Sequence, residues 1–281
     1  SLRAGTQAQS VLDSEGNTNL FNTKEFGVEA SIFFPQFVSP IKLRDFAKER
    51  QPRTTLTVGY NYQIRPIYTR QIALLTFGYN WMKNNQVQHI LTPVTLNSVK
   101  VEPTPSFAQI LEKETNQRIK DQYTSHLIFG LDYTYIFNNQ DVRFLKDFFY
   151  FKANIQSSGN LISLLNNTSL VKTIDNYHEI FGIRYAQFAR LSLDFRYFKY
   201  IIGENQIATR FMIGAGIPYG NSNDMPFEKS FYAGGTNGMR GWAFRELGPG
   251  SFNNPQNLNI ERIGDIQLEF NLEYRFPIHK F

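Results

Sequence analysis

The sequence contains no cysteine, so disulfide frameworks and thiolate metal sites are excluded. It has no run of about 18 apolar residues, which excludes a transmembrane helix. The opening SLRAGTQAQS lacks the basic start and apolar block of a signal peptide, so the chain is either cytosolic or a mature fragment. The formal net charge of +5 is spread along the chain without a block of like charges, and we expect no nucleic-acid partner.

Motifs for the common chemistries are missing too. The histidines show no metal-ligand spacing; they are His89, His126, His178 and His279. GAGIPYG at 214–220 resembles a dinucleotide loop only loosely, and glycine in a strand more often marks close packing or a bend. Gly-x-Ser-x-Gly does not occur, so the usual hydrolase elbow is absent. The sequence therefore offers no metal or nucleotide site.

Aromatic residues are abundant, with 26 Phe and 15 Tyr, and the dominant pattern has a period of two residues. In DIQLEFNLEYRF, 265–276, apolar and polar residues alternate strictly, which indicates a strand with one apolar and one polar face. We predict about ten such strands. Their approximate centres are residues 6, 30, 58, 75, 130, 151, 182, 195, 211 and 270, with a further candidate at ILTPVTLNSVKV, 90–101. SFAQILEKETNQRIK predicts a short helix that begins after Ser106, although a polar loop is nearly as compatible.

The alternation fits two architectures. In a soluble sandwich the apolar face is the core, whereas in an outer-membrane barrel it meets lipid and the polar face lines the lumen. Aromatic residues near strand ends and mixed charges on the polar faces favour the barrel. We expect Leu268, Phe270 and Leu272 to face lipid, and Glu269 and Asn271 to face the lumen. The strands predicted to share one antiparallel sheet include 53–64, 124–137, 190–201 and 265–277.

The stretch KSFYAGGTNGMRGWAFRELGPG, 229–250, combines glycines with bulky aromatic residues. A phosphate-binding loop would need Gly-Lys-Ser/Thr and a following helix, and a flexible linker would lack the aromatics. The composition therefore predicts a long loop packed into a defined shape. Gly238 and Gly241 flank the pair Met239-Arg240 and permit turns with positive φ that project the guanidinium. Such a group favours a carboxylate partner, and the next strand supplies Glu269 and Glu273.

These residues resemble a known family. DMPFEKSFYAGGTNGMRGW is similar to the loop-six region of the BamA/TamA superfamily of outer-membrane assembly factors, whose Val/Ile-Arg-Gly-Phe/Tyr tetrad corresponds to Met239-Arg240-Gly241-Trp242. LGPG, NLEYRFP and KEFGVEASIFFP also match, and the resemblance is specific over about residues 205–278. FRELGPGS resembles the Bacteroidota branch, which includes TamA-like lipoproteins.

The resemblance implies an all-β fold, an antiparallel transmembrane β-barrel of 16 strands with a long loop inserted into its lumen. About ten strands are represented here, so residues 1–281 form a single outer-membrane β-barrel domain that is incomplete, without the POTRA domains and some strands. We name residues 221–262 the glycine-rich loop and expect it to fold into the lumen with Phe231, Tyr232 and Trp242 buried. The implied motif residues are Gly234, Gly235, Gly238, Met239, Arg240, Gly241 and Trp242. The implied inner-wall partner of Arg240 is Glu273, with Glu269 and Asp265 as alternatives.

The function implied is insertion or assembly of β-barrel proteins in the bacterial outer membrane, or their translocation, without enzymatic activity or cofactor. The implied partners are nascent outer-membrane proteins, outer-membrane lipids and accessory assembly subunits. Two alternatives keep a related barrel: a two-partner secretion transporter, and the barrel anchor of a patatin-like lipase. A plain porin or ligand-gated receptor does not explain the MRGW loop.

Overall fold

The computed structural model describes residues 2–7, 11–12, 18–19, 23–39, 50–174, 176–235, 238–239, 241–248, 250 and 262–278. Its strands are β1 (Leu2–Gln7), β2 (Val11–Leu12), β3 (Thr18–Asn19), β4 (Thr23–Phe34), β5 (Arg53–Ile64), β6 (Tyr68–Asn84), β7 (Val87–Pro103), β8 (His126–Asn138), β9 (Phe148–Ser158), β10 (Val171–Ile174), β11 (Tyr177–Ile180), β12 (Ile183–Tyr185), β13 (Phe188–Tyr200), β14 (Gln206–Pro218) and β15 (Ile266–Arg275). The helices are α1 (Pro105–Lys113), α2 (Gln117–Gln122) and α3 (Asn160–Ser163).

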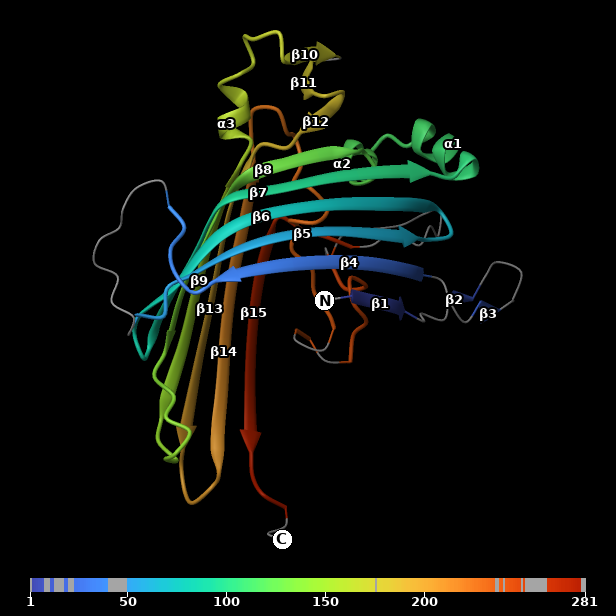
Figure 1. The fold of residues 1–281 in the computed structure, drawn as a ribbon. Coiled ribbons are helices and arrows are strands. Elements are labelled where there is room, and N and C mark those ends of the chain that lie inside the picture. Colours follow the sequence, from blue (N-terminus) through green and yellow to red (C-terminus); the bar gives the residue numbers. More distant parts are fainter. Residues whose placement is uncertain are drawn as a thin grey trace.

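One curved sheet dominates the structure (Figure 1). Its strands follow one another in the order β1-β4-β5-β6-β7-β8-β9-β13-β14-β15. Every neighbouring pair in this path is antiparallel. These observations confirm the predicted all-β antiparallel fold. Over the described residues the sheet is open between β1 and β15, so a closed barrel of 16 strands stays a prediction.

The predicted strands agree closely with the observed ones. The segments predicted at 53–64, 124–137, 190–201 and 265–277 are β5, β8, β13 and β15. The candidate at 90–101 is the middle of β7, which is 17 residues long. The strand predicted near residue 182 is wrong, because Phe181 and Gly182 form the tight turn between β11 and β12, which lie off the main path.

The two faces of the sheet are inverted relative to a soluble protein. On β15, Leu268 and Phe270 are 71% and 63% exposed, whereas Glu269 between them is only 7% exposed. Leu272 shares the exposed face, and Asn271 lies with Glu269 on the covered one. The predicted division of this strand into an apolar and a polar face is therefore confirmed, whereas contact of the apolar face with lipid stays a prediction. We call the concave, covered side of the sheet the inner face and the exposed apolar side the outer face (Figure 1).

The connections at the two ends of the sheet differ in length. Three long ones leave from the same end, residues 104–125, 159–187 and 219–265. At the opposite end β6 and β7, and β13 and β14, are joined by short hairpins, and the longest connection at this end, residues 35–52 between β4 and β5, is shorter than any of those three. Outer-membrane barrels show this asymmetry, with short turns on one side and long loops on the other. Figure 1 shows the segment that follows β14 on the concave side of the sheet.

The predicted helix over 106–120 is broken into α1 and α2. The N-cap of α1 is Thr104 rather than Ser106, since Pro105 takes the first helical turn. Between the helices, the Glu114 carboxylate accepts from the backbone N–H groups of Thr115 and Asn116. The Asn116 side chain then caps α2, and these local bonds end one helix and start the next.

Side chains pack into small clusters at the end of the sheet with the long connections. The first joins the two helices to β6 and β7, and its members are Tyr68, Val99, Val101, Phe107, Ile119 and Tyr123. The second joins the glycine-rich loop to β8 and β13, with Ile128, Ala186, Phe188 and Met225. The third is formed by Ile162, Ile180 and Tyr185 against Leu127 and Phe129. The long connections are thus packed elements rather than free loops.

Candidate functional site

The inner face carries a row of ionic contacts across β13, β14 and β15. Arg210 Nη2 lies 3.0 Å from Asp194 Oδ2, and Arg210 Nη1 lies 3.0 Å from Glu269 Oε1. Arg196 Nη2 binds the same Asp194 oxygen at 2.8 Å. The strand register explains this geometry. Met212 of β14 pairs with Asp194 on β13 and with Glu269 on β15. Arg210 lies two residues before Met212 on the same face of β14, so its side chain lies near both carboxylates. One guanidinium therefore joins the carboxylates of two other strands.

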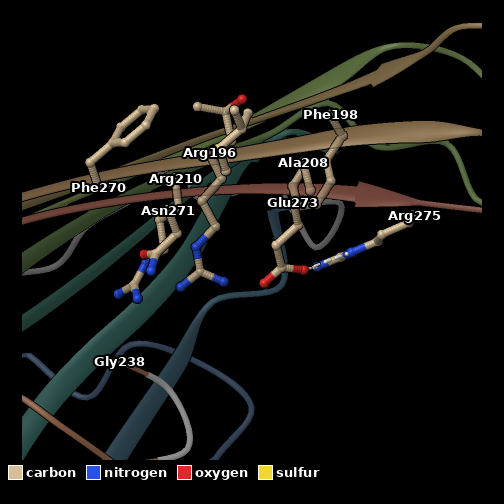
Figure 2. Close-up of a pocket in the computed structure, with 11 residues that line it drawn as sticks. Arg196, Phe198, Ala208, Arg210, Gly238, Phe270, Asn271, Glu273 and Arg275 are labelled. Carbon is tan, nitrogen blue, oxygen red and sulfur yellow. Dashed lines mark hydrogen bonds and ion pairs between the residues drawn. The ribbon is translucent and has the colours of Figure 1, made fainter. Parts of the chain in front are cut away.

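The glycine-rich loop approaches this row at Glu269. A methyl group added to Gly238 would lie 3.6 Å from Glu269 Oε2. Gly238 also lines a cavity of about 490 Å³ together with Arg196, Arg210 and Glu273. Figure 2 shows the two arginine side chains projecting into this cavity on the side of Gly238, whereas Phe270 points away on the other side of the strands. The loop and the charged wall thus enclose one polar space.

Two glycines of β14, Gly214 and Gly216, leave space that side chains of the glycine-rich loop fill, and we call each of these spaces a seat. A Cβ on Gly214 would lie 2.3 Å from Phe231 Cε1, and a Cβ on Gly216 would lie 2.7 Å from Met225 Cε. Any larger residue would occupy the space of these side chains. Phe231 is 3% exposed and Met225 is 4% exposed. The GAGIPYG glycines therefore mark close packing, as the sequence predicts, and that packing holds the loop against the wall.

Phe231 is held from its other side by β13. The Arg190 guanidinium carbon lies 4.0 Å from the centre of the Phe231 ring, and Arg190 Nε donates to the Lys229 carbonyl at 2.9 Å. The backbone of Phe231 pairs with Gly264 through two hydrogen bonds of 2.8 Å. Such a cation–π contact contributes about 0.5–2 kcal/mol, the larger values applying where the groups are desolvated. Phe231 is consequently held by its fit against Gly214, by the Arg190 guanidinium and by backbone pairing with Gly264.

Glu228 is a second anchor, at the long-connection end of the sheet. Its Oε2 accepts from His126 Nε2 of β8 at 2.8 Å, and Arg70 Nε of β6 lies 3.6 Å from its Oε1. His126 Nδ1 lies 2.9 Å from the carbonyl oxygen of Thr124, which only accepts. Both ring nitrogens therefore donate, and the histidine is a cation. Burial alone would raise the pKa of Glu228, but the charges of His126 and Arg70 outweigh burial and lower that pKa from 4.5 to about 2.

Next to this anchor, two guanidinium groups stack on one loop aromatic ring. The guanidinium carbons of Arg70 and Arg245 lie 4.1 Å and 4.2 Å from the centre of the Phe227 ring. Arg245 also lies 4.7 Å from the Phe244 ring centre, so it joins two parts of the loop. The loop residues that follow Pro226 are thereby tied to the inner face of β6.

The loop also binds the other two long connections. The buried Asn221 side chain exchanges hydrogen bonds of 2.7 Å and 2.8 Å with the backbone of His178 and donates to the Tyr185 carbonyl at 2.8 Å. Just after the loop, Asp265 Oδ1 lies 2.5 Å from Arg118 Nη2 of α2. The three connections therefore form one interlocked cap over this end of the inner face.

The structure describes only part of the predicted motif. Gly241 adopts a positive φ of 89°, as expected, whereas Gly238 is not among the residues with positive φ. Arg240 lies outside the described residues, so its contact with a carboxylate stays a prediction. Its three candidate partners each bind another cation: Asp265 binds Arg118, Glu269 binds Arg210 and Glu273 binds Arg275 at 2.7 Å.

The predicted burial of the loop aromatics holds for one of three. Phe231 is buried as expected, but Tyr232 is 39% exposed and Trp242 is 52% exposed, so those two predictions are wrong. The physical reason is that a folded-back loop has two sides. Phe231 lies in the seat on the wall, whereas Tyr232 and Phe244 pack on each other with ring centres 4.4 Å apart.

Sequence reasoning missed Glu228, His126, Arg190 and Asn221 as anchors. Strand parity could have identified His126, because residues 126, 130, 132 and 134 share the polar face of β8. Parity likewise places Arg190 beside Ser192 and Asp194 on β13. No local signal distinguishes Glu228 or Asn221, since their partners are about 100 and 40 residues away in the sequence.

Over the described residues, no group of three or more His, Asp or Glu side chains is arranged to hold a metal ion. None of the helices in that part of the chain is long and apolar enough to span a bilayer.

The profile of the Omp85 superfamily domain matches residues 1–281. No curated protein matches this sequence significantly. Omp85 proteins are associated with outer membranes and act in the insertion or translocation of outer-membrane proteins.

Proposed function

This chain belongs to the Omp85 superfamily, and on that premise we propose that it inserts and folds β-barrel proteins in the bacterial outer membrane, in the manner of BamA and TamA. Residues 1–281 would form one barrel domain whose outer face lies in lipid. The protein would act on nascent outer-membrane proteins, together with accessory assembly subunits, and without an enzymatic step or a cofactor.

The anchored glycine-rich loop is the observation that carries this proposal. The loop lies on the inner face, seated on Gly214 and Gly216 and tied to β6 and β8 through Glu228. A lumen occupied in this way supports assembly of substrates at the barrel wall in preference to passage of a chain through the lumen. At the wall, unpaired backbone groups of a nascent strand are costly in lipid and gain from pairing with an offered strand.

The inverted faces support placement in the membrane. The exposed apolar side chains of β15 would cost free energy in water, at roughly 25 cal/mol per Å² of apolar surface. Lipid removes that cost, while the charged row of Asp194, Arg210 and Glu269 stays on the inner face. A charge on the lipid side would instead cost about 2–4 kcal/mol at the bilayer midplane.

A reconstituted assembly assay tests the proposal. The protein is placed in liposomes, an unfolded β-barrel substrate is added, and folding is followed by heat-modifiable migration and by protease protection. We expect the substrate to become folded within the bilayer. Delivery of the substrate into the vesicle interior would instead indicate the two-partner secretion alternative, and lipolysis would indicate the lipase alternative.

The motif arginine is tested in the same assay. Arg240→Ala should lower the assembly rate while leaving a folded, heat-modifiable protein, because the loop rather than the barrel would be misplaced. Arg240→Lys should restore only part of the rate, since an ammonium group lacks the planar fork of the guanidinium. The matched control is Arg143→Ala, at an exposed arginine whose partner Asp141 lies in the same hairpin. Normal assembly by Arg240→Ala would contradict the role of the motif.

A further inference from the structure

The connection between β9 and β13, residues 159–187, forms several short elements of its own, and the site described above uses only its contacts with the cap. We call it the rim extension. It contains α3, β10, β11 and β12, and Figure 1 shows these elements together beyond the end of β8. It is joined to the sheet where β12 pairs in parallel with the start of β8, Arg184 with His126 and Tyr185 with Leu127. The rim extension is therefore fixed in position relative to the sheet.

Its hydrophobic cluster packs on the outer face. Ile162, Ile180 and Tyr185 are buried against Leu127 and Phe129 of β8. Leu127 and Phe129 have the same strand parity as Leu131, which is 42% exposed on the outer face. The apolar side chains on the outer face of β8 thus continue into the buried cluster of the rim extension.

Arg184 and His178 of the rim extension bind polar groups of the cap. Arg184 Nη1 lies 3.6 Å from Asp121 Oδ2 of α2, and Arg184 Nε donates to the Asn221 backbone carbonyl at 3.2 Å. His178 is bound by Asn221 through its backbone. Outside that cluster, six large apolar side chains are exposed, namely Leu161, Leu164, Leu165, Leu170, Ile174 and Phe181. These polar contacts hold the rim extension to the cap, while its exposed surface carries large apolar side chains together with polar residues such as Lys172.

Phe181 provides an independent indication of a ligand-facing role. Ile180 pairs with Ile183, so Phe181 and Gly182 form a two-residue hairpin turn, with φ of 53° and 75°. Turns with two positive φ angles favour Asn-Gly, and a bulky residue is strained in the first position. Phe181 is nevertheless 87% exposed. Phe181 is therefore an aromatic residue at a hairpin tip, where its positive φ strains the backbone and its apolar ring is exposed to solvent.

We propose that the rim extension inserts its exposed apolar side chains into the boundary between headgroups and acyl chains of the surrounding membrane. The inference rests on the membrane placement under the proposed function. The occupant is assigned as lipid because the hydrophobic cluster of the extension packs on the apolar outer face of β8, and because the pairing of β12 with β8 and the contact of Arg184 with Asp121 fix the extension beside that face. An aromatic residue at the tip suits this boundary, where aromatic residues of membrane proteins gather.

Spin-label accessibility in liposomes of phosphatidylethanolamine and phosphatidylglycerol tests the proposal. The sequence has no cysteine, so single labels at Phe181→Cys and Leu164→Cys need no other change. Leu268→Cys on β15 reports the lipid-facing barrel, and Thr115→Cys between α1 and α2 reports the exposed cap. We expect the ratio of oxygen to nickel-chelate collisions at 181 and 164 to be severalfold above that at 115 and to approach that at 268.

The outcomes separate this inference from the proposed function. If 268 is lipid-accessible but 181 and 164 behave like 115, the rim extension lies in water and the inference is wrong, while the membrane barrel stands. If 181 and 164 are shielded from both reagents, a protein partner or a second copy covers them, and the inference is again wrong. If 268 is also accessible only to the nickel chelate, the membrane placement itself fails and the inference fails with it.

Discussion

The seat on Gly214 allows a direct test of whether the glycine-rich loop is docked on the inner face. The perturbation is Gly214→Ala, which adds one methyl group. The new Cβ would lie 2.3 Å from Phe231 Cε1, well short of the ~3.5–4.0 Å at which carbon atoms pack. Phe231 cannot shift easily, because Arg190 lies over its ring and its backbone is paired with Gly264.

The magnitude follows from two opposing effects. Overpacking of this kind typically costs about 1–3 kcal/mol. Alanine is better than glycine in a strand by about 0.5–1 kcal/mol, but this gain is present whether the loop is docked or released. The docking equilibrium therefore loses the full ~1–3 kcal/mol, which corresponds to an increase of roughly 5- to 150-fold in the population of the released loop.

Limited trypsinolysis measures that population. The Lys229 carbonyl accepts from Arg190 in the docked loop, so cleavage after Lys229 requires release. Where opening and closing are fast, the cleavage rate follows the open population, and the rate of this single cut should rise by the same factor. Heat-modifiable migration of the barrel should be unchanged, because the strand itself is not weakened.

Two controls make the test decisive. Gly59→Ala places a methyl group on the inner face of β5, where the nearest atoms are 3.6 Å and 3.7 Å away, and it should not change the cleavage. In a Phe231→Ala background, Gly214→Ala should have no further effect, since its steric partner is gone. Equal cleavage rates for Gly214→Ala and Gly59→Ala would refute the docked loop.

Three further predictions concern other parts of the molecule. Because the pKa of Glu228 is lowered from 4.5 to about 2, the anchor is fully present above pH 4.5 and is lost as the pH falls toward 2; hydrogen exchange of the loop should show this loss, and Glu228→Gln should abolish it. Labels at Leu268 and Glu269 should show opposite accessibility to lipid-soluble and water-soluble quenchers, and equal accessibility would count against the barrel. Phe181→Asn should raise the stability in detergent by about 1 kcal/mol, since asparagine tolerates positive φ; an unchanged or lower melting temperature would contradict the strain.

The sheet was largely predictable because alternation is a local property. A strand such as β15 shows its two faces in its own residues, and no distant partner is needed to assign them. The strand at 90–101 was predicted only as a further candidate, and the structure explains why its alternation is irregular. The register of β7 shifts against β8 between Thr92 and Thr95, so the alternation changes phase within that segment. A pattern with a change of phase is difficult to recognise from sequence alone.

The anchors of the loop were beyond sequence reasoning, since each depends on contacts between distant segments. Glycine in GAGIPYG indicates close packing, but nothing near it indicates that Phe231 and Met225 are the neighbours. Glu228 and His126 become partners only once the curvature of the sheet brings the loop to β8. Exposure of Trp242 was mispredicted for a related reason, because composition shows that a loop is packed but not which side of it is covered.

The interlocked cap has a practical consequence for labelling and engineering this protein. Long loops normally tolerate inserted tags, because they carry few contacts. Here an insertion near Asn221, in α2 or in the rim extension would disturb contacts with the neighbouring connection as well as its own. The hairpin at the opposite end, around the 88% exposed Val142, carries no such shared contact at that residue in the described structure. An epitope or fluorophore placed there would leave the cap intact and report on the protein in its working state.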